Sequence, residues 1–202
     1  MDLYAVLLFY LSLFAAMKIR IFKKYGIRFS EFFVVKEHVR QDIAYGIITY
    51  IKFLLGLAAA VVLIFLVASM WDMIFQTRAL EQVNIFFTAS QLEKIGAQER
   101  AVGISGVILI FFFAPFFEEL FFRGCLYRAL RLRFDQLWAI IISSFVFSLL
   151  HGYFFIFFYV FAVGLILAYM YEKRGSLIAP LTFHMLNNLI VILFVATSRN
   201  LR

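Results

Sequence analysis

Charged residues are scarce in this chain. Asp, Glu, Lys and Arg make up only 15% of its 202 residues, and 65% are hydrophobic, whereas soluble domains are about a quarter charged and about half apolar. One core could not bury that much apolar surface, so the composition excludes a soluble globular domain and indicates a lipid environment. Cysteine is scarce too: Cys125 is the only one, which excludes an intrachain disulfide.

Long uncharged runs are what the chain has instead. They cover residues 3–16, 53–71, 101–117, 136–171 and 175–198. A helix needs about 20 mostly apolar residues to cross a bilayer, and the fourth run would be about 54 Å long as one helix, so we divide it near His151 and Gly152. The expected fold is an all-α, polytopic membrane helix bundle with about six transmembrane helices, forming a single membrane domain over residues 1–202.

The basic residues are unevenly distributed between the two sides of this six-span scheme. The net charge is +7, and 13 of the 19 basic residues lie in or beside three segments, residues 18–40, 123–133 and 173–174, which fall on one side. The positive-inside rule makes that side the cytoplasm and puts both termini outside. The basic excess therefore predicts topology, and we expect a lipid bilayer as partner and no nucleic acid.

Ionisable residues inside apolar spans are the first candidates for function, because charge is costly in lipid. The stretch FFAPFFEELFFRG contains Glu118, Glu119 and Arg123. Glu119 and Arg123 are four residues apart, the spacing of a same-face helical ion pair, whereas Glu118 points about 100° away from Glu119. We expect Glu119 to neutralise Arg123, which leaves Glu118 for chemistry. The alternative is a purely structural charge cluster that holds helices together.

Two histidines and an amide belong to later spans. The turn between the third and fourth spans is expected near Phe134 and Asp135, so Glu118 and His151 should lie level in an antiparallel hairpin. His184 and Asn188 are four residues apart in HMLNN and share one face of the last span. Hydrogen bonding between helices is the alternative explanation for His184 and Asn188, and for His151 the alternative is a core histidine whose hydrogen bonds are satisfied.

A carboxylate, two imidazoles and an amide in one layer are suited to hydrolysis. A glutamate acts as general base on water, with a histidine to orient the water or share the proton, while a second histidine and an amide stabilise an oxyanion. The sequence lacks the H-E-x-x-H of zinc metalloproteases. Its aspartates, Asp2, Asp42, Asp72 and Asp135, all lie outside the middle of the spans, which excludes an aspartyl dyad.

Together these motifs resemble the CAAX protease and bacteriocin-processing (CPBP) family of intramembrane proteases, relatives of the type II CAAX prenyl endopeptidases. The family's E-E-x-x-x-R corresponds to Glu118, Glu119 and Arg123. Its F-x-x-x-H corresponds to Phe147 and His151, and its H-x-x-x-N to His184 and Asn188. The motifs cover about residues 112–191, and the first 100 residues carry no feature of the family.

The resemblance implies an intramembrane endopeptidase that cuts a membrane-associated peptide or protein. Glu118 and His151 would activate water, His184 and Asn188 would stabilise the oxyanion, and Glu119, Arg123 and Phe147 would support them. Residues 1–100 would provide two spans and an external loop, and residues 101–202 the catalytic helical core. The expected location is a bacterial cytoplasmic membrane, with the active site opening towards the cytoplasm.

Three alternatives stay open. The favoured mechanism uses no cofactor, but Glu118, His151 and His184 also form a His₂Glu set of the kind that binds zinc. A non-catalytic bacteriocin-immunity or scaffold protein would keep the fold without turnover. A transporter would use Glu118 as a proton relay, although transporters often contain internal repeats and we find none in this sequence.

Overall fold

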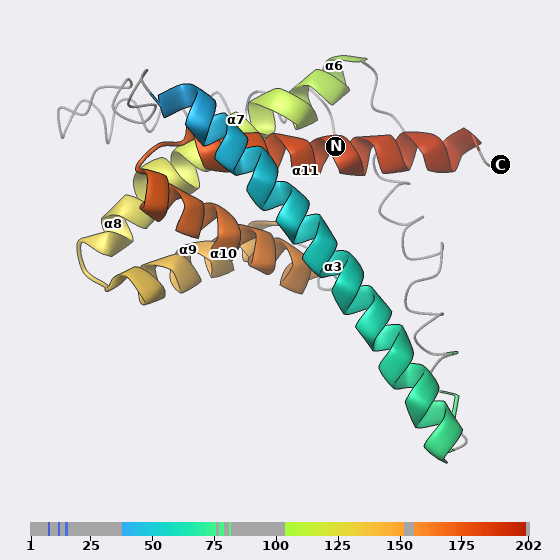
Figure 1. The fold of residues 1–202 in the computed structure, drawn as a ribbon. Coiled ribbons are helices and arrows are strands. Elements are labelled where there is room, and N and C mark those ends of the chain that lie inside the picture. Colours follow the sequence, from blue (N-terminus) through green and yellow to red (C-terminus); the bar gives the residue numbers. More distant parts are fainter. Residues whose placement is uncertain are drawn as a thin grey trace.

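The computed structural model of the protein describes residues 38–75, 104–151 and 156–200, together with residues 8, 12, 15, 77, 78 and 81. In the described part, the elements are all helical: α3 (Val39–Phe75), α6 (Ile104–Ile108), η4 (Leu109–Phe113), α7 (Ala114–Glu119), η5 (Leu120–Tyr127), α8 (Arg128–Arg131), α9 (Gln136–Leu150), α10 (Phe157–Arg174) and α11 (Ile178–Asn200). Figure 1 shows α9 and α10 side by side, with α3 crossing the bundle obliquely. The predicted all-α class is confirmed.

The number of membrane spans is less well defined than the helical class. Of the described helices, α3 alone combines the length and the apolar composition that a membrane crossing requires, and the apolar segments Gln136–Leu150 and Ile178–Phe194 are shorter. Most of the predicted span over residues 3–16 and most of the predicted external loop lie outside the described residues. The count of six spans therefore stays a prediction.

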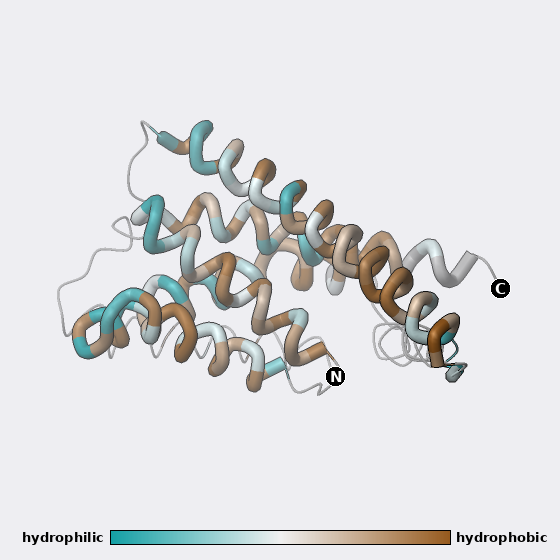
Figure 2. The backbone as a smooth tube through the Cα atoms, turned by 60° about the horizontal axis from the view of Figure 1, so that its bottom comes forward, coloured by the Kyte–Doolittle hydropathy of each residue, from teal (hydrophilic) through white to brown (hydrophobic). Residues whose placement is uncertain are grey.

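Helix α3 has two different halves. Its first half packs against α11, where the missing side chain of Gly46 allows the close approach: a Cβ there would lie 2.8 Å from the Ala179 carbonyl oxygen. Asp42 is buried and pairs with Arg174 at the end of α10, with 2.5 Å between Oδ1 and Nε. The second half projects beyond the other helices and is apolar and exposed (Figures 1 and 2).

A single helical path runs from Ile104 to Arg131 and contains two π-helical stretches, η4 and η5. Between them lies α7, the short α-helical segment that carries both glutamates and begins with Ala114 and Pro115. π-Helical turns inside α-helices are frequent at functional sites. Here they flank the acidic pair on both sides.

The antiparallel hairpin follows the predicted plan. After Arg131 the chain turns, and Asp135 caps the start of α9 by accepting a hydrogen bond from the Trp138 backbone N–H at 2.9 Å. Helix α9 ends at Leu150, so His151 lies at the predicted break. Tyr127 and Arg131 contact Glu172 of α10 at 2.8 and 3.2 Å, which fixes the turn end of the hairpin to its neighbour.

Helices α9 and α10 cross closely because two small residues meet. A Cβ on Gly164 would lie 3.0 Å from the Cβ of Ser144 and 3.3 Å from the Phe147 ring. Small residues at such crossings are typical of membrane helix pairs. Helix α10 ends at Arg174 and is capped by Gly175, whose φ of 65° is left-handed and whose N–H donates to the Tyr171 carbonyl. This tight end returns the chain into α11, which brings the last motif back to the bundle.

Candidate active site

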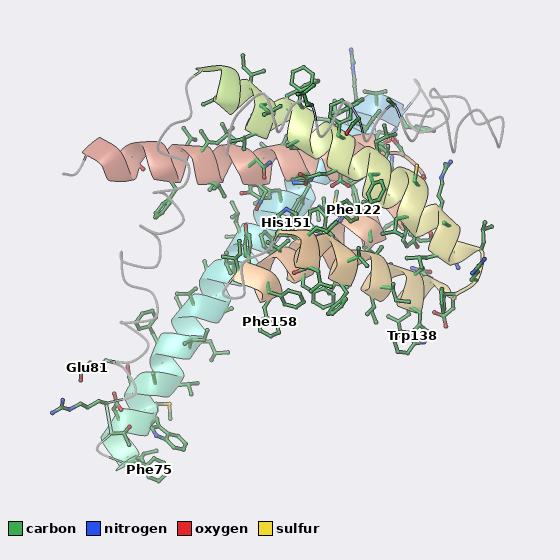
Figure 3. The ribbon with its side chains drawn as sticks, turned by 180° about the vertical axis from the view of Figure 1, so that it is seen from behind. Phe75, Glu81, Phe122, Trp138, His151 and Phe158 are labelled. Atoms are coloured by element: carbon green, nitrogen blue, oxygen red, sulfur yellow. The ribbon has the colours of Figure 1, made fainter. Side chains whose placement is uncertain are left out.

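Glu118, His151 and His184 meet inside the bundle, although they come from three different helical segments. Glu118 Oε2 lies 3.9 Å from His151 Nε2 and 3.6 Å from His184 Nε2. Figure 3 shows His151 between the helices, near Phe122 and away from the outward-pointing Trp138 and Phe158. The equal depth predicted for Glu118 and His151 from their distances to the turn is confirmed by this contact.

Both histidines turn the same ring nitrogen towards Glu118. His151 Nδ1 lies 2.8 Å from the backbone carbonyl oxygen of Phe147, and since a carbonyl only accepts, Nδ1 carries the proton. His184 Nδ1 lies 2.7 Å from Glu119 Oε1, which is likewise an acceptor when ionised. In a neutral ring the Nε2 of each histidine is then the basic nitrogen, and it faces the Glu118 carboxylate.

Glu119 and Arg123 form the buried side of the site. Their side chains are each 1% exposed, and Arg123 Nη1 donates to Glu119 Oε1 at 2.9 Å, as the four-residue spacing predicts. Arg123 Nη2 also donates to the Gly164 carbonyl at 3.2 Å. Glu119 Oε1 therefore accepts from both Arg123 and His184, so one carboxylate oxygen connects the ion pair to the histidine of α11.

The Phe147 ring supports three of these groups. It lies 4.6 Å from the Arg123 guanidinium carbon, and its centroid is 4.5 Å from that of His151 and 5.8 Å from that of His184. A guanidinium over an aromatic face gains a cation–π attraction. The F-x-x-x-H motif thus has two physical reasons: the ring packs against the cation and the imidazoles, and its carbonyl orients His151.

The two asparagines of HMLNN have different partners. Asn188 Nδ2 donates to the Ile110 carbonyl oxygen of η4 at 2.9 Å. Asn187 is buried and accepts from the Tyr159 hydroxyl at 2.5 Å. The structure therefore puts Asn188 beside the helix that carries Glu118, and its contact there is with the backbone.

Sequence reasoning missed two contacts of the site. The sequence does not predict the bond from His184 to Glu119, because the four-residue spacing pairs Glu119 with Arg123 alone. The Gly164 carbonyl as an acceptor for Arg123 has no signal beyond a glycine in an apolar helix. In the described part of the chain, no group of three or more His, Cys, Asp or Glu side chains forms a ready-made metal site.

A comparison with protein families matches residues 100–190 to the family described as type II CAAX prenyl endopeptidase Rce1-like. Residues 100–190 form an Rce1-like domain. This confirms the predicted family, and the Rce1-like segment contains all seven motif residues, whereas α3 and the end of α11 lie outside it. No curated protein and no solved structure matches the chain.

Proposed function

We propose that the protein is an intramembrane endopeptidase that hydrolyses a peptide bond in a membrane-associated peptide or protein. The observation that carries the proposal is the convergence of Glu118 Oε2 with the Nε2 atoms of His151 and His184, at 3.9 and 3.6 Å, in an Rce1-like domain. Its family's name points to prenylated C-terminal segments as the substrate class.

Glu118 is the proposed base, with His151 as its partner. The separation of Glu118 Oε2 and His151 Nε2 is longer than a direct hydrogen bond, which suits a water molecule that donates to both. The water oxygen attacks the carbonyl carbon of the substrate, and its proton passes to Glu118. Collapse of the tetrahedral intermediate breaks the C–N bond, and the same proton goes to the leaving amine.

His184 is the proposed oxyanion donor, in its protonated form. Its Nδ1–H is held by Glu119, and Nε2–H would then point towards the substrate oxygen. Glu118, Glu119 and Arg123 would together carry a net charge of −1 when ionised, which one imidazolium would balance. The family resemblance also implies an oxyanion role for Asn188, which would need the second N–H of its amide, because the bond to Ile110 uses the first.

Exposure supports a role for the Glu118 side of the site. The side chains of Glu118 and His151 are 17% and 33% exposed, against 4% for His184. Water and a substrate chain can therefore reach Glu118 and His151, whereas the groups behind them are sealed. This is the distribution that a hydrolytic site in a membrane requires, since water must be admitted to one place only.

The proposed topology has several membrane spans, both termini outside, and an active site that opens to a bacterial cytoplasm. It is supported by the basic residues of the segments 18–40, 123–133 and 173–174. Cysteines introduced one at a time, Lys24→Cys or Glu93→Cys, in a Cys125→Ser background should label from opposite sides of the membrane. Labelling from the same side would contradict this topology.

Reconstituted protein tests the activity directly. Proteoliposomes are incubated with a fluorogenic peptide bearing a C-terminal prenylcysteine motif, or with the same peptide lacking the prenyl group, and cleavage is located by mass spectrometry. We expect wild type to cut and Glu118→Ala to be inactive. A rate for wild type no higher than that for Glu118→Ala on both peptides would favour the non-catalytic scaffold, and proton flux without cleavage would favour a transporter.

A zinc-dependent protease is the second candidate, and the histidine orientations favour it. In both histidines Nδ1 is held by an oxygen acceptor and Nε2 faces a carboxylate, which is how metal-binding histidines are usually supported. Glu118, His151 and His184 would hold the ion, which would supply Lewis-acid activation of water. One equivalent of zinc in active enzyme, lost with activity on chelation and restored together, would select this candidate; activity that survives chelators selects the metal-free mechanism.

A further inference from the structure

One backbone carbonyl next to the site lacks the donor that a regular helix would provide. In η4 the Ala114 N–H donates to the Leu109 carbonyl, five residues back. In an α-helix it would instead serve Ile110, four residues back. Continuing the wide pattern, the donor for Ile110 would be residue 115, which is Pro115 and has no N–H. The wide turn and the proline together therefore deprive the Ile110 carbonyl of a backbone partner.

The side chain of Asn188 supplies the missing donor. Its Nδ2 lies 2.9 Å from the Ile110 oxygen, although the two residues are 78 positions apart. A backbone acceptor in an apolar environment needs a partner, so this bond is what lets the turn remain wide at Pro115. Asn188 belongs to α11, which packs against both η4 and α7.

Helix α11 thus holds the glutamate segment at two points. His184 bonds Glu119 at the end of α7, and Asn188, one helical turn later, bonds Ile110 in η4, before α7 begins. Glu118 lies between these points, three residues after Pro115. A π turn contains more residues per turn than an α turn, so closing it to α geometry would rotate the following residues and turn Glu118 away from the histidines.

We propose that Asn188 is a positioning residue that keeps the Leu109–Phe113 turn wide and thereby aims Glu118 at His151 and His184. The inference rests on the proposed function in taking Glu118 as the base. It differs from the oxyanion role in that Asn188 acts through the Ile110 carbonyl and not on the substrate. In this chain the asparagine of H-x-x-x-N then has a structural role that depends on Pro115 in the segment packed against α11.

A double-mutant cycle between Asn188 and Pro115 tests this. Pro115→Ala restores a backbone N–H that can serve Ile110 in the wide pattern, so Asn188 becomes dispensable for the turn. We expect Asn188→Ala to lower kcat on the order of 10²-fold, the loss typical of a reacting group displaced by about 1 Å, with KM little changed. Pro115→Ala should change kcat by only a few-fold, and the double variant should return to within a few-fold of Pro115→Ala.

Equal effects of Asn188→Ala in the two backgrounds would contradict the proposal. If Asn188 acts only as an oxyanion donor, Asn188→Ala lowers kcat by the same factor in the wild-type background and in the Pro115→Ala background, and the proposal is wrong. Should Asn188→Ala fail to fold, folding of the double variant supports the proposal, and its failure overturns it.

Thermal unfolding of the same four proteins in detergent separates this inference from the proposed function. Asn188→Ala should lower Tm markedly when Pro115 is present and only slightly in the Pro115→Ala background. That pattern would support the Asn188–Ile110 link even if no substrate were cleaved. Equal losses of Tm in both backgrounds would overturn the link even in an active protease.

Discussion

The two sides of the His184 ring differ in exposure and in partners. On one side Glu119, Arg123 and Phe147 are each about 1% exposed, and Arg123 contacts both of the others. On the other side Glu118 and His151 are partly exposed, and their polar atoms are separated by 3.9 Å. Adjacent glutamates of one helix thus have different surroundings, because the 100° between successive residues directs Glu119 into the core and Glu118 towards the partly exposed side.

This difference indicates how a charged site is kept inside an apolar bundle. The buried carboxylate is neutralised by a guanidinium with an aromatic ring over it, which fixes the geometry of His184. The partly exposed carboxylate faces two histidine nitrogens at longer range, so a water or substrate can come between them. Changing one side should therefore affect chemistry, and changing the other should affect folding first.

The largest effect on cleavage is expected for Glu118→Gln. The amide keeps the size of the side chain but removes the base, and general-base catalysis contributes roughly 10²–10⁴-fold. Tm in detergent should stay within a few degrees of wild type, because Glu118 lies on the partly exposed side of the site, whereas Glu119 is the carboxylate that pairs with the buried Arg123. Wild-type turnover by the folded variant would show that Glu118 is not the general base, and it would contradict the proposal that the partly exposed side of the site carries the chemistry.

The next effect is expected for Glu119→Gln, and it should appear first in stability. Arg123 would become a buried charge without its partner, which destabilises proteins by about 3–5 kcal/mol. The matched control is the double variant Glu119→Gln with Arg123→Met, which removes both charges and should regain most of the unfolding free energy while cleavage stays impaired, since His184 has lost its carboxylate. Recovery of full activity in the double variant would show that Glu119 serves Arg123 only.

The smallest effect is expected for Phe147→Leu. Leucine is apolar and smaller, so the change removes the ring from beneath Arg123 and His151 and should destabilise the protein by about 1–3 kcal/mol, combining a cation–π loss with a small cavity. Cleavage should fall only several-fold. Phe158→Leu is the control, because Phe158 is 71% exposed and should change stability by less than about 0.5 kcal/mol. Equal effects of the two substitutions would contradict the supporting role of Phe147.

Much of the site could be predicted from sequence because it depends on helical periodicity. The spacing of Glu119 and Arg123 predicted their contact, and the position of the turn predicted the depth of His151. The partner of Asn188 could not be predicted in this way. That contact depends on η4, where the helical period changes. A regular 3.6-residue repeat gives every interior carbonyl a backbone donor, so it does not predict that the Ile110 carbonyl needs a side-chain donor.

The helical class of the fold could also be predicted from the sequence, whereas the number of membrane spans stays a prediction. Composition and uncharged runs indicated an all-α membrane protein, and the break at His151 followed from the length of a bilayer crossing. The position of His184 on its helix does not predict its contact with Glu119. The imidazole has two nitrogens, and it contacts Glu119 with one while it faces Glu118 with the other. The number of spans depends in part on residues 3–16 and 82–103, most of which lie outside the described part of the chain.

Because α3 contacts α11 closely at Gly46, a small change in the angle between the two helices there displaces the far end of α3. The helix is fastened near its beginning, by Asp42 and by the glycine contact, while its other end projects. Phe75 lies about 44 Å along the helix from Gly46, so a tilt of only about 5° at the crossing displaces that end by about 4 Å. A side chain at residue 46 would therefore change how widely the apolar second half of α3 diverges from α11.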